Sequence, residues 1–388
     1  MKSLNNSKIT INYKIGIDVF DLFYIVRKIY CVLLLLIFVS LNPLQAKPNK
    51  HFRVIGYYCG SSIPVDSFEI EKLTHIIFSF GHLKGNLFHI NNKTDSLTIQ
   101  RMIAMKGRNP DLKVMLTIGG WSGCPTCSDV FNSKKGRQEF AQSVKTNLQF
   151  FKADGIDLDW EYPAIKGFPG HTFRKEDKHN FTLLVQTLRE VLGKKYEISF
   201  AAGGFTTYID SSIEWNEVKK YVNFINVMSY DLVHGYSKIT GHHTPLFSNS
   251  QQIESTDHAV KMLIQQGVER NQIVIGSAFY GRYFRVENIN NNGLYQAGYF
   301  VKSVSHKFIN DSIVNPINGF ELHWDSTAQA PYAINRNRKL FFTYENEKSV
   351  ALKTKYALHE NLGGIMFWQL YDDKLHHGLL NEINKQLK

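Results

Sequence analysis

Three carboxylic acids alternate with apolar residues in one short segment of this chain, Asp154-Gly-Ile-Asp-Leu-Asp-Trp-Glu161. Side chains two positions apart on a β-strand share a face, so Asp157, Asp159 and Glu161 point the same way, about 6.6 Å further along at each step. An unpaired buried carboxylate costs several kcal/mol, and neighbouring negative charges raise its pKa. An acid paired with arginine or a metal cage would be the structural alternatives. Three alternating acids without a histidine-rich partner set favour proton-transfer chemistry instead.

Glu161 comes last in this row, so at the end of a barrel strand it would lie nearest the carboxyl-terminal mouth, where such barrels hold their active sites. We expect it to donate a proton, with the charge of Asp159 raising its pKa. Asp157, one step deeper, is expected to share a proton with Asp159 as part of one coupled group. Cleavage of a glycosidic bond needs such an acid, kept protonated near neutral pH. Trp160 has the opposite parity and is expected in the core.

The elements that must position this row alternate along the chain. Short runs rich in Val, Ile and Phe predict strands at 54–58, 75–80, 113–118, 155–159, 197–202, 224–228, 273–278 and 364–368. Amphipathic stretches predict helices at 134–153, 178–192, 256–266, 347–361 and 375–387. Eight strands alternating with helices predict an α/β protein whose parallel sheet closes into a (β/α)8 barrel spanning residues 47–388.

One interval interrupts this rhythm. Residues 283–344, between the seventh strand and the helix that follows it, carry turn-rich pieces and short alternating runs. A structureless loop of that length is improbable in a compact domain. We therefore expect a small α+β insertion subdomain on the rim of the barrel.

The first 46 residues differ from the rest. Arg27 and Lys28 precede an apolar run at 29–41, and Leu44-Gln45-Ala46 offers a cleavage site. This order is typical of a secretory signal peptide, and the run is short for a membrane span, although a retained amino-terminal anchor is the alternative. We expect secretion to an extracellular or periplasmic space, with no stable membrane insertion after cleavage.

Composition narrows the function classes. The whole chain has 388 residues, is 43% apolar and carries a net charge of +11, and removal of residues 1–46 leaves +8. No Lys/Arg-rich block and no nucleic-acid motif accompany that charge, so we expect no nucleic-acid binding. Beyond the first 46 residues the cysteines are Cys59, Cys124 and Cys127, which permit one bridge in an oxidising compartment and leave the pairing open. One CxxC pair in a Gly/Trp-rich loop indicates neither zinc binding nor redox chemistry.

The acidic segment resembles the DxxDxDxE motif of glycoside hydrolase family 18, the retaining chitinases and their relatives. Two further segments support the resemblance: Thr117–Trp121 is similar to the family's third-strand SxGG element, and Met228–Asp231 to its sixth-strand MxYD element. Tyr280-Gly-Arg282 and the strand at 364–368 also fit the pattern. The resemblance extends from residue 54 to residue 387, with Thr117 standing where the family usually has Ser.

The resemblance implies a substrate-assisted mechanism without cofactor or metal. The acetamido carbonyl of the substrate attacks the anomeric carbon, and Glu161 acts first as acid and then as base. Asp159 orients the acetamido N–H, the hydroxyl of Tyr230 holds the acetamido oxygen, and Asp231 contacts the same sugar. Trp368 forms the floor under the ring.

Other candidates for substrate binding are less specific. They are Tyr57, Trp121, Met228, Tyr280 and Arg282. Tyr57 could equally fill the barrel, and Arg282 could equally tie the insertion to it. The pairs His242-His243 and His376-His377 are expected at the surface.

These features predict a secreted, monomeric, endo-acting chitinase that binds chitin or N-acetylglucosamine oligosaccharides. The enzymatic alternative is an endo-β-N-acetylglucosaminidase acting on N-glycans, which uses the same acids. A non-catalytic chitin lectin on the same barrel is the alternative from another class, and the acid at position 161 argues against it.

Overall fold

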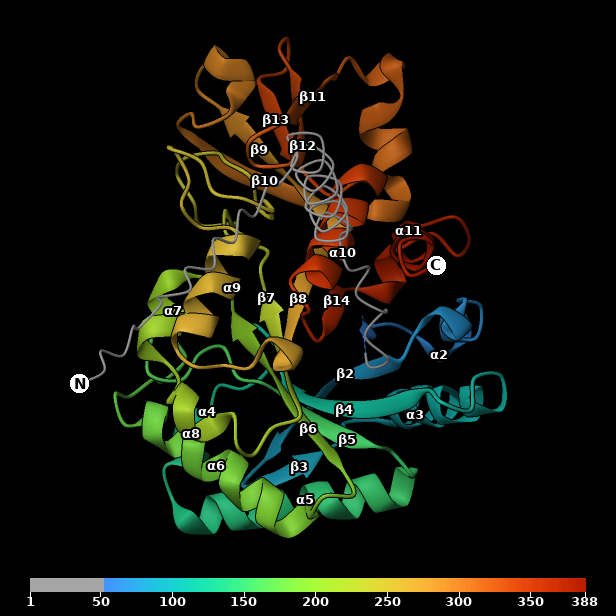
Figure 1. Ribbon diagram of the computed structural model, residues 1–388, viewed down its shortest axis with the longest axis vertical. Coiled ribbons are helices and arrows are strands. Elements are labelled where there is room, and N and C mark those ends of the chain that lie inside the picture. The colour runs from blue at the N-terminus through green and yellow to red at the C-terminus, as the bar shows by residue number, and fades with distance from the viewer. Residues whose placement is uncertain (1–51) are drawn as a thin grey trace, which may run out of the picture. The chain divides into compact units, whose positions relative to one another are not determined.

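Eight parallel strands pair side by side and close on themselves, because β1 pairs with both β2 and β14 (Figure 1). The computed structural model describes residues 52–388, so the predicted signal peptide at 1–46 lies outside the described residues. The barrel strands are β1 (Arg53–Tyr58), β2 (His75–Lys84), β4 (Lys113–Gly119), β5 (Gly155–Asp159), β6 (Glu197–Gly203), β7 (Phe224–Met228), β8 (Ile273–Ala278) and β14 (Gly364–Trp368). All eight predicted strands are confirmed, and so is the (β/α)8 class.

Helices connect successive strands, and in Figure 1 α5 and α6 lie outside β5 and β6. They are α2 (Ser62–Val65), α3 (Lys93–Ala104), α4 (Cys127–Phe131), α5 (Lys134–Phe151), α6 (Asp177–Leu192), α7 (Thr206–Ser211), α8 (Trp215–Val218), α9 (Thr256–Gln265), α10 (Glu347–His359) and α11 (Leu379–Lys385). The predicted helices match α5, α6, α9, α10 and α11, although α11 begins four residues later than predicted. None of the helices in the described part of the chain is long and apolar enough to cross a bilayer.

Apolar side chains form two cores around the barrel wall. The larger one fills the space between strands and helices. It includes Trp160, which is 5% exposed and packs on Phe131 and Phe181, as its parity predicts. The smaller one lies inside the barrel and includes Tyr57, Met115 and Met366, with Met228, Tyr230 and Trp368 packed against it. The barrel is therefore filled by side chains, with its polar residues in the remaining interior positions.

A second, antiparallel sheet interrupts the barrel after β8, in the order β10-β9-β13-β12-β11. Its strands are β9 (Tyr280–Val286), β10 (Gly298–Ser305), β11 (Glu321–Asp325), β12 (Ala330–Asn335) and β13 (Leu340–Thr343), drawn in orange to red in Figure 1. The predicted α+β insertion is confirmed as an element of the fold. Its first strand begins at Tyr280 rather than at 283, because only Phe279 separates β8 from β9.

Candidate active site

Burial decreases along the acidic row on β5. Asp157 is fully buried, Asp159 is 4% exposed and Glu161, beyond the last residue of the strand, is half-buried. The row therefore climbs from the barrel interior toward the carboxyl ends of the strands. Gly119 lets β4 approach closely here, because a Cβ at that position would lie 2.0 Å from the carbonyl oxygen of Asp159.

Asp157 is enclosed by donors from four other strands. Oδ2 accepts from the hydroxyls of Tyr57 at 2.8 Å and Thr117 at 3.4 Å, and Oδ1 accepts from Ser199 at 2.5 Å and Asn226 at 3.1 Å. Burial raises the pKa of Asp157, while these four hydrogen bonds favour its charged form and oppose that shift. No hydrogen bond joins Asp157 to Asp159 within residues 52–388. The Asp157 oxygens are engaged by these four donors, and a proton shared with Asp159 stays a prediction.

Asp159 is in the opposite situation. Its Oδ1 is buried and has no hydrogen-bond partner among the described residues. Burial, followed by the charges of Glu161 and Asp157, raises the pKa of Asp159 well above its ordinary value. An unsatisfied buried oxygen costs about 1–3 kcal/mol, so native proteins keep few of them without a reason. Burial thus disfavours the charged form of Asp159, and its Oδ1 is left without a partner among the described residues.

Glu161 is poised to exchange a proton near neutral pH. Burial and the nearby charge of Asp231 raise the pKa of its carboxyl to about 7. A group with this pKa is protonated in a useful fraction of molecules and can also accept the proton back. This is the behaviour expected of a residue that acts first as acid and then as base.

Aromatic side chains surround the top of the row. The hydroxyl of Tyr230, just after β7, lies 3.8 Å from Met366 Sδ, its one hydrogen-bond partner within residues 52–388. Trp368, at the end of β14, stacks on Phe80 with ring centroids 5.5 Å apart and an interplanar angle of 17°. The ring of Tyr57 lies 6.0 Å from Trp368. At 2% exposure Tyr57 presents little surface to a ligand, and its hydroxyl serves Asp157.

Phe80 was missed in the sequence because it lies in a long strand and looked like core. Its place at the last position of the predicted strand, 75–80, was the available signal, since barrel sites are built from strand ends.

Asp231 ties the site to the insertion sheet. Arg282 on β9 donates through Nε to Oδ1 at 2.6 Å and through Nη2 to Oδ2 at 2.5 Å, and Tyr280 donates to Oδ1 at 2.8 Å. Burial opposes ionisation of Asp231, but His243 and the Arg282 guanidinium outweigh it and hold the pKa well below its usual range. Of the two roles open to Arg282, the structure shows the link between insertion and barrel.

The expectation that His242 and His243 lie at the surface is wrong. They are 1% and 0% exposed. His242 Nε2 lies 3.0 Å from Asp325 Oδ2, and His243 Nδ1 lies 3.6 Å from Asp231 Oδ1. Asp325 is the last residue of the insertion strand β11, and Asp231 follows the barrel strand β7, so the two histidines are enclosed by partners from both sheets. His376 and His377, by contrast, are exposed as expected.

Trp121 follows the two glycines after β4 and is 39% exposed. The rings of Tyr162, Phe168 and Tyr236 surround it at centroid distances of 6.2, 5.8 and 6.3 Å. Trp121 and Tyr236 are exposed, and with the partly buried Tyr162 and Phe168 they form an aromatic surface on which a sugar can stack.

The loop behind Trp121 contains a disulfide between Cys124 and Cys127, while Cys59 is exposed and forms no disulfide within residues 52–388. In the part of the chain that the structure describes, no three His, Cys, Asp or Glu side chains are grouped to hold a metal ion.

Comparison with known proteins agrees with this geometry. The sequence profile described as "Glycosyl hydrolases family 18" matches residues 53–373. Chitinase A1 of Niallia circulans is 29% identical over 86% of this chain and 58% of its own length. Mouse chitotriosidase-1 is 27% identical over 80% of this chain and 69% of its own length.

Among solved structures, a glycoside hydrolase family 18 N-acetylglucosaminidase from Paenibacillus barengoltzii superposes with a TM-score of 0.78. It is 33% identical, and the match covers 86% of this chain and 99% of that one. The profile match spans most of the chain and includes the acidic row, Tyr230, Asp231 and Trp368. The chain therefore belongs to glycosyl hydrolases family 18.

Proposed function

We propose that this protein is a secreted endo-acting chitinase that hydrolyses β-1,4 linkages between N-acetylglucosamine units. The observation that carries the proposal is that the three acids differ in their hydrogen bonds and in their pKa values. Asp157 has both oxygens engaged, Asp159 has an unpaired buried oxygen and a pKa well above its ordinary value, and the pKa of Glu161 is raised to about 7. The hydrogen bonds of Asp157 and the disfavoured charge of Asp159 make both acids poor nucleophiles, which favours a nucleophile supplied by the substrate.

The proposed reaction has two steps. In the first, Glu161 gives its proton to the glycosidic oxygen while the substrate's acetamido oxygen bonds to the anomeric carbon and the glycosidic bond breaks. In the second, a water molecule attacks the anomeric carbon, gives a proton to Glu161, and the bond to the acetamido oxygen breaks. Both displacements invert the anomeric carbon, so the product retains its configuration.

Other side chains support this reaction by their positions. Asp159 offers its unpaired oxygen to the acetamido group beside the reacting carbon, and Tyr230 presents a hydroxyl that no hydrogen bond to oxygen or nitrogen engages among residues 52–388. Trp368, stacked on Phe80, supports the sugar ring from below. Trp121 and its neighbouring rings extend the aromatic surface for further sugar units.

The names of the relatives favour two neighbouring activities. The relative from Niallia circulans is named a chitinase, whereas the Paenibacillus structure is named an N-acetylglucosaminidase and is 33% identical across almost its whole length. Release of single N-acetylglucosamine units is therefore the second candidate, alongside cleavage within N-glycans. Because this chain spans 58% of the length of chitinase A1, we assign none of that protein's other properties to it.

Product analysis tests the proposal. Wild-type protein is incubated with N-acetylchitohexaose and, separately, with a high-mannose glycopeptide. We expect dimers to tetramers from the hexamer, and loss of activity of at least about a thousandfold in Glu161→Gln. Glu269→Gln, an exposed acid on the outside of the barrel, is the matched control and keeps wild-type activity. Monomer as the sole early product, or cleavage of the glycopeptide alone, contradicts endo-chitinase activity.

A further inference from the structure

A completely buried ion pair lies behind the active site. Lys353 on α10 is 0% exposed, Glu345 just after β13 is 1% exposed, and Nζ and Oε1 are 2.5 Å apart. Burying such a pair costs about as much desolvation energy as its attraction returns, so hydrophobic residues would stabilise the fold equally well. Stability alone therefore does not explain the buried pair, and its hydrogen bonds indicate a role in positioning other residues.

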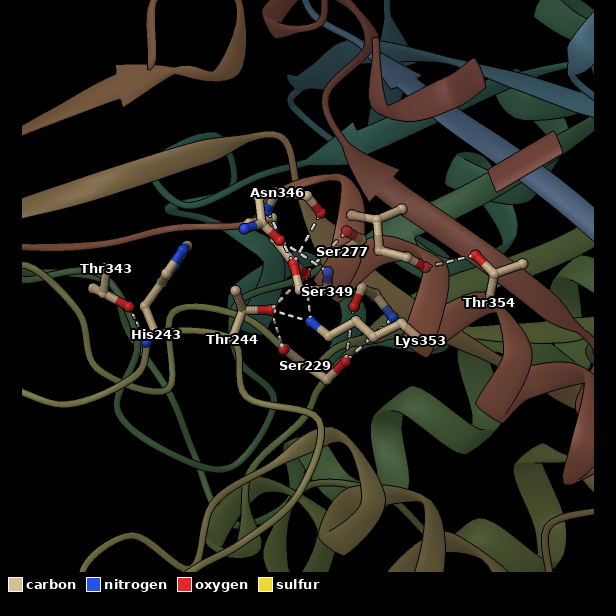
Figure 2. Close-up of polar contacts among 12 residues, drawn as sticks. Ser229, His243, Thr244, Ser277, Thr343, Asn346, Ser349, Lys353 and Thr354 are labelled. Atoms are coloured by element: carbon tan, nitrogen blue, oxygen red, sulfur yellow. Dashed lines mark hydrogen bonds and ion pairs between the residues drawn. The ribbon is translucent and has the colours of Figure 1, made fainter. Parts of the chain in front are cut away.

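These hydrogen bonds lead from α10 to the barrel, as Figure 2 shows. Lys353 Nζ also donates to Thr244 Oγ1 at 2.5 Å, and the Thr244 hydroxyl lies 3.1 Å from the carbonyl oxygen of Ser229. Glu345 Oε1 lies 3.3 Å from the same hydroxyl, but it already accepts from Lys353 and from Ser277 at 3.0 Å. Of the two acceptors near the Thr244 hydroxyl, the carbonyl oxygen of Ser229 is the nearer and has fewer other donors.

Ser229 is held from a second side by β8. Its hydroxyl donates to the carbonyl of Gly276 at 3.1 Å and accepts from the amide of Gly276 at 3.2 Å. Gly276 also lies against the ring of Tyr230, because a Cβ there would be 2.9 Å from Tyr230 Cε1. Ser229 immediately precedes Tyr230, so every bond that fixes Ser229 also fixes the backbone from which the Tyr230 ring projects.

We propose that Thr244 and Lys353 are positioning residues that hold Tyr230 in its reactive place. The inference rests on the proposed function, in which the Tyr230 hydroxyl contacts the acetamido group. Lys353 orients the Thr244 hydroxyl, and the Thr244 hydroxyl binds the carbonyl oxygen of Ser229. This hydrogen bond fixes the backbone at Ser229 and thereby the position of the Tyr230 side chain. Neither positioning residue contacts the substrate.

Replacement of Thr244 by valine tests this with little change of shape. Thr244→Val removes the anchoring hydroxyl, and a displaced Tyr230 should lower kcat about tenfold with KM changed less than about twofold. Thr354→Val is the matched control: Thr354 is also 0% exposed and lies on α10 near Lys353, but its hydroxyl bonds only to the carbonyl of Val350 at 2.8 Å. The control should keep wild-type kcat, and Thr244→Ser should restore it.

Combination with Tyr230→Phe separates positioning from general loss of packing. If Thr244 acts through the Tyr230 hydroxyl, Thr244→Val should change kcat less than about twofold in the Tyr230→Phe background. A full tenfold effect in that background, or wild-type kcat for Thr244→Val alone, overturns the proposal.

The ion pair has its own variants. Lys353→Met alone leaves Glu345 charged and unpaired in the core, so it should unfold at a much lower temperature. Lys353→Met combined with Glu345→Gln removes both charges, should fold, and should show the reduced kcat of Thr244→Val. Wild-type kcat in this folded double variant contradicts the role of Lys353.

A crystal structure of Thr244→Val separates this inference from the proposed function. If wild-type protein cleaves no N-acetylchitooligosaccharide, the proposed function has failed, and the crystal structure still decides the positioning. Displacement of the Tyr230 hydroxyl from Met366 Sδ supports it, whereas an unchanged 3.8 Å contact overturns it.

Discussion

Arg282 binds Asp231 through two parallel hydrogen bonds, with Nε 2.6 Å from Oδ1 and Nη2 2.5 Å from Oδ2. Arg282 belongs to the first strand of the insertion sheet, and Asp231 follows Tyr230 at the mouth of the barrel. The pair joins the two sheets beside the reacting acids. A shift of the insertion sheet would therefore move Asp231 and, with it, the neighbouring residues of the active site.

Arg282→Lys tests how much the bidentate contact with Asp231 contributes to the free energy of unfolding. Lysine cannot form both bonds, so we expect the free energy of unfolding to fall by about 1–2 kcal/mol. Arg285→Lys is the control, since Arg285 lies on the same strand but is exposed and bonds to the carbonyl of Arg338. Urea unfolding of both variants measures the difference, and equal stabilities would contradict a special role for Arg282.

The contact between Arg282 and Asp231 also predicts how the stability of the fold depends on pH. Arg282 and His243 hold the pKa of Asp231 well below its usual range, so the stability that they provide is present at neutral pH. It should be lost as the pH falls below about 3.9, where the unfolded chain takes up the proton first. Wild type and Arg282→Lys should therefore converge in stability at low pH. A difference that stays constant from pH 7 to pH 2 would exclude this origin.

Activity should fall as the pH rises through about 7, because burial raises the pKa of Glu161 to about 7 and only its protonated form can donate. Above that point kcat/KM should drop about tenfold per pH unit. Because the folded-state pKa is raised, stability linked to this group should also decrease as the pH rises from about 4.3 toward 7. Initial rates on N-acetylchitooligosaccharides between pH 4 and 9 test the first statement, and full activity at pH 9 would refute it.

Tyr57→Phe should slow the reaction without any loss of substrate contact. Tyr57 donates to Asp157 at 2.8 Å and accepts from Asn226 at 2.9 Å, so its removal leaves Asp157 with three donors and Asn226 with one fewer acceptor. We expect kcat to fall about tenfold and stability to fall by about 1–2 kcal/mol. Tyr58→Phe, at a neighbouring residue whose hydroxyl bonds to the backbone of Ser61, should lose stability but keep kcat.

Gly276→Ala should damage the site through crowding. A Cβ there would lie 2.5 Å from the carbonyl oxygen of Val227 and 3.0 Å from Met366 Cε, with the Tyr230 ring at a similar distance. Overpacking of this kind costs about 1–3 kcal/mol, and displacement of Tyr230 should lower kcat as well. Gly107→Ala meets nothing within 4 Å and should stay within about 0.5 kcal/mol of wild type. Wild-type kcat in Gly276→Ala would contradict the prediction that the added methyl group displaces the Tyr230 ring and lowers kcat.

Local patterns were sufficient to predict most of the fold. The barrel strands and five of the helices were predictable because hydrophobic periodicity is recorded within each segment. The helix α3 was missed, although Asn92 at its start accepts a hydrogen bond from the amide of Asp95 and offered a capping signal. The start of the insertion sheet was misplaced because Tyr280 and Arg282 were assigned to the segment that follows the seventh barrel strand, whereas they belong to β9.

Sequence by itself determined that Asp157, Asp159 and Glu161 share one face, since parity along a strand is a local property. Only the tertiary structure decided what each acid does. The donors to Asp157 come from residues between 40 and 100 positions away, and their arrival depends on the register of neighbouring strands. The burial of His243 and the path from Lys353 to Ser229 depend likewise on how the insertion and α10 pack against the barrel. Spacing along a chain shows which side chains can lie on one face of a strand. The partners that shift a pKa or fix the position of an aromatic ring are brought together only by tertiary packing.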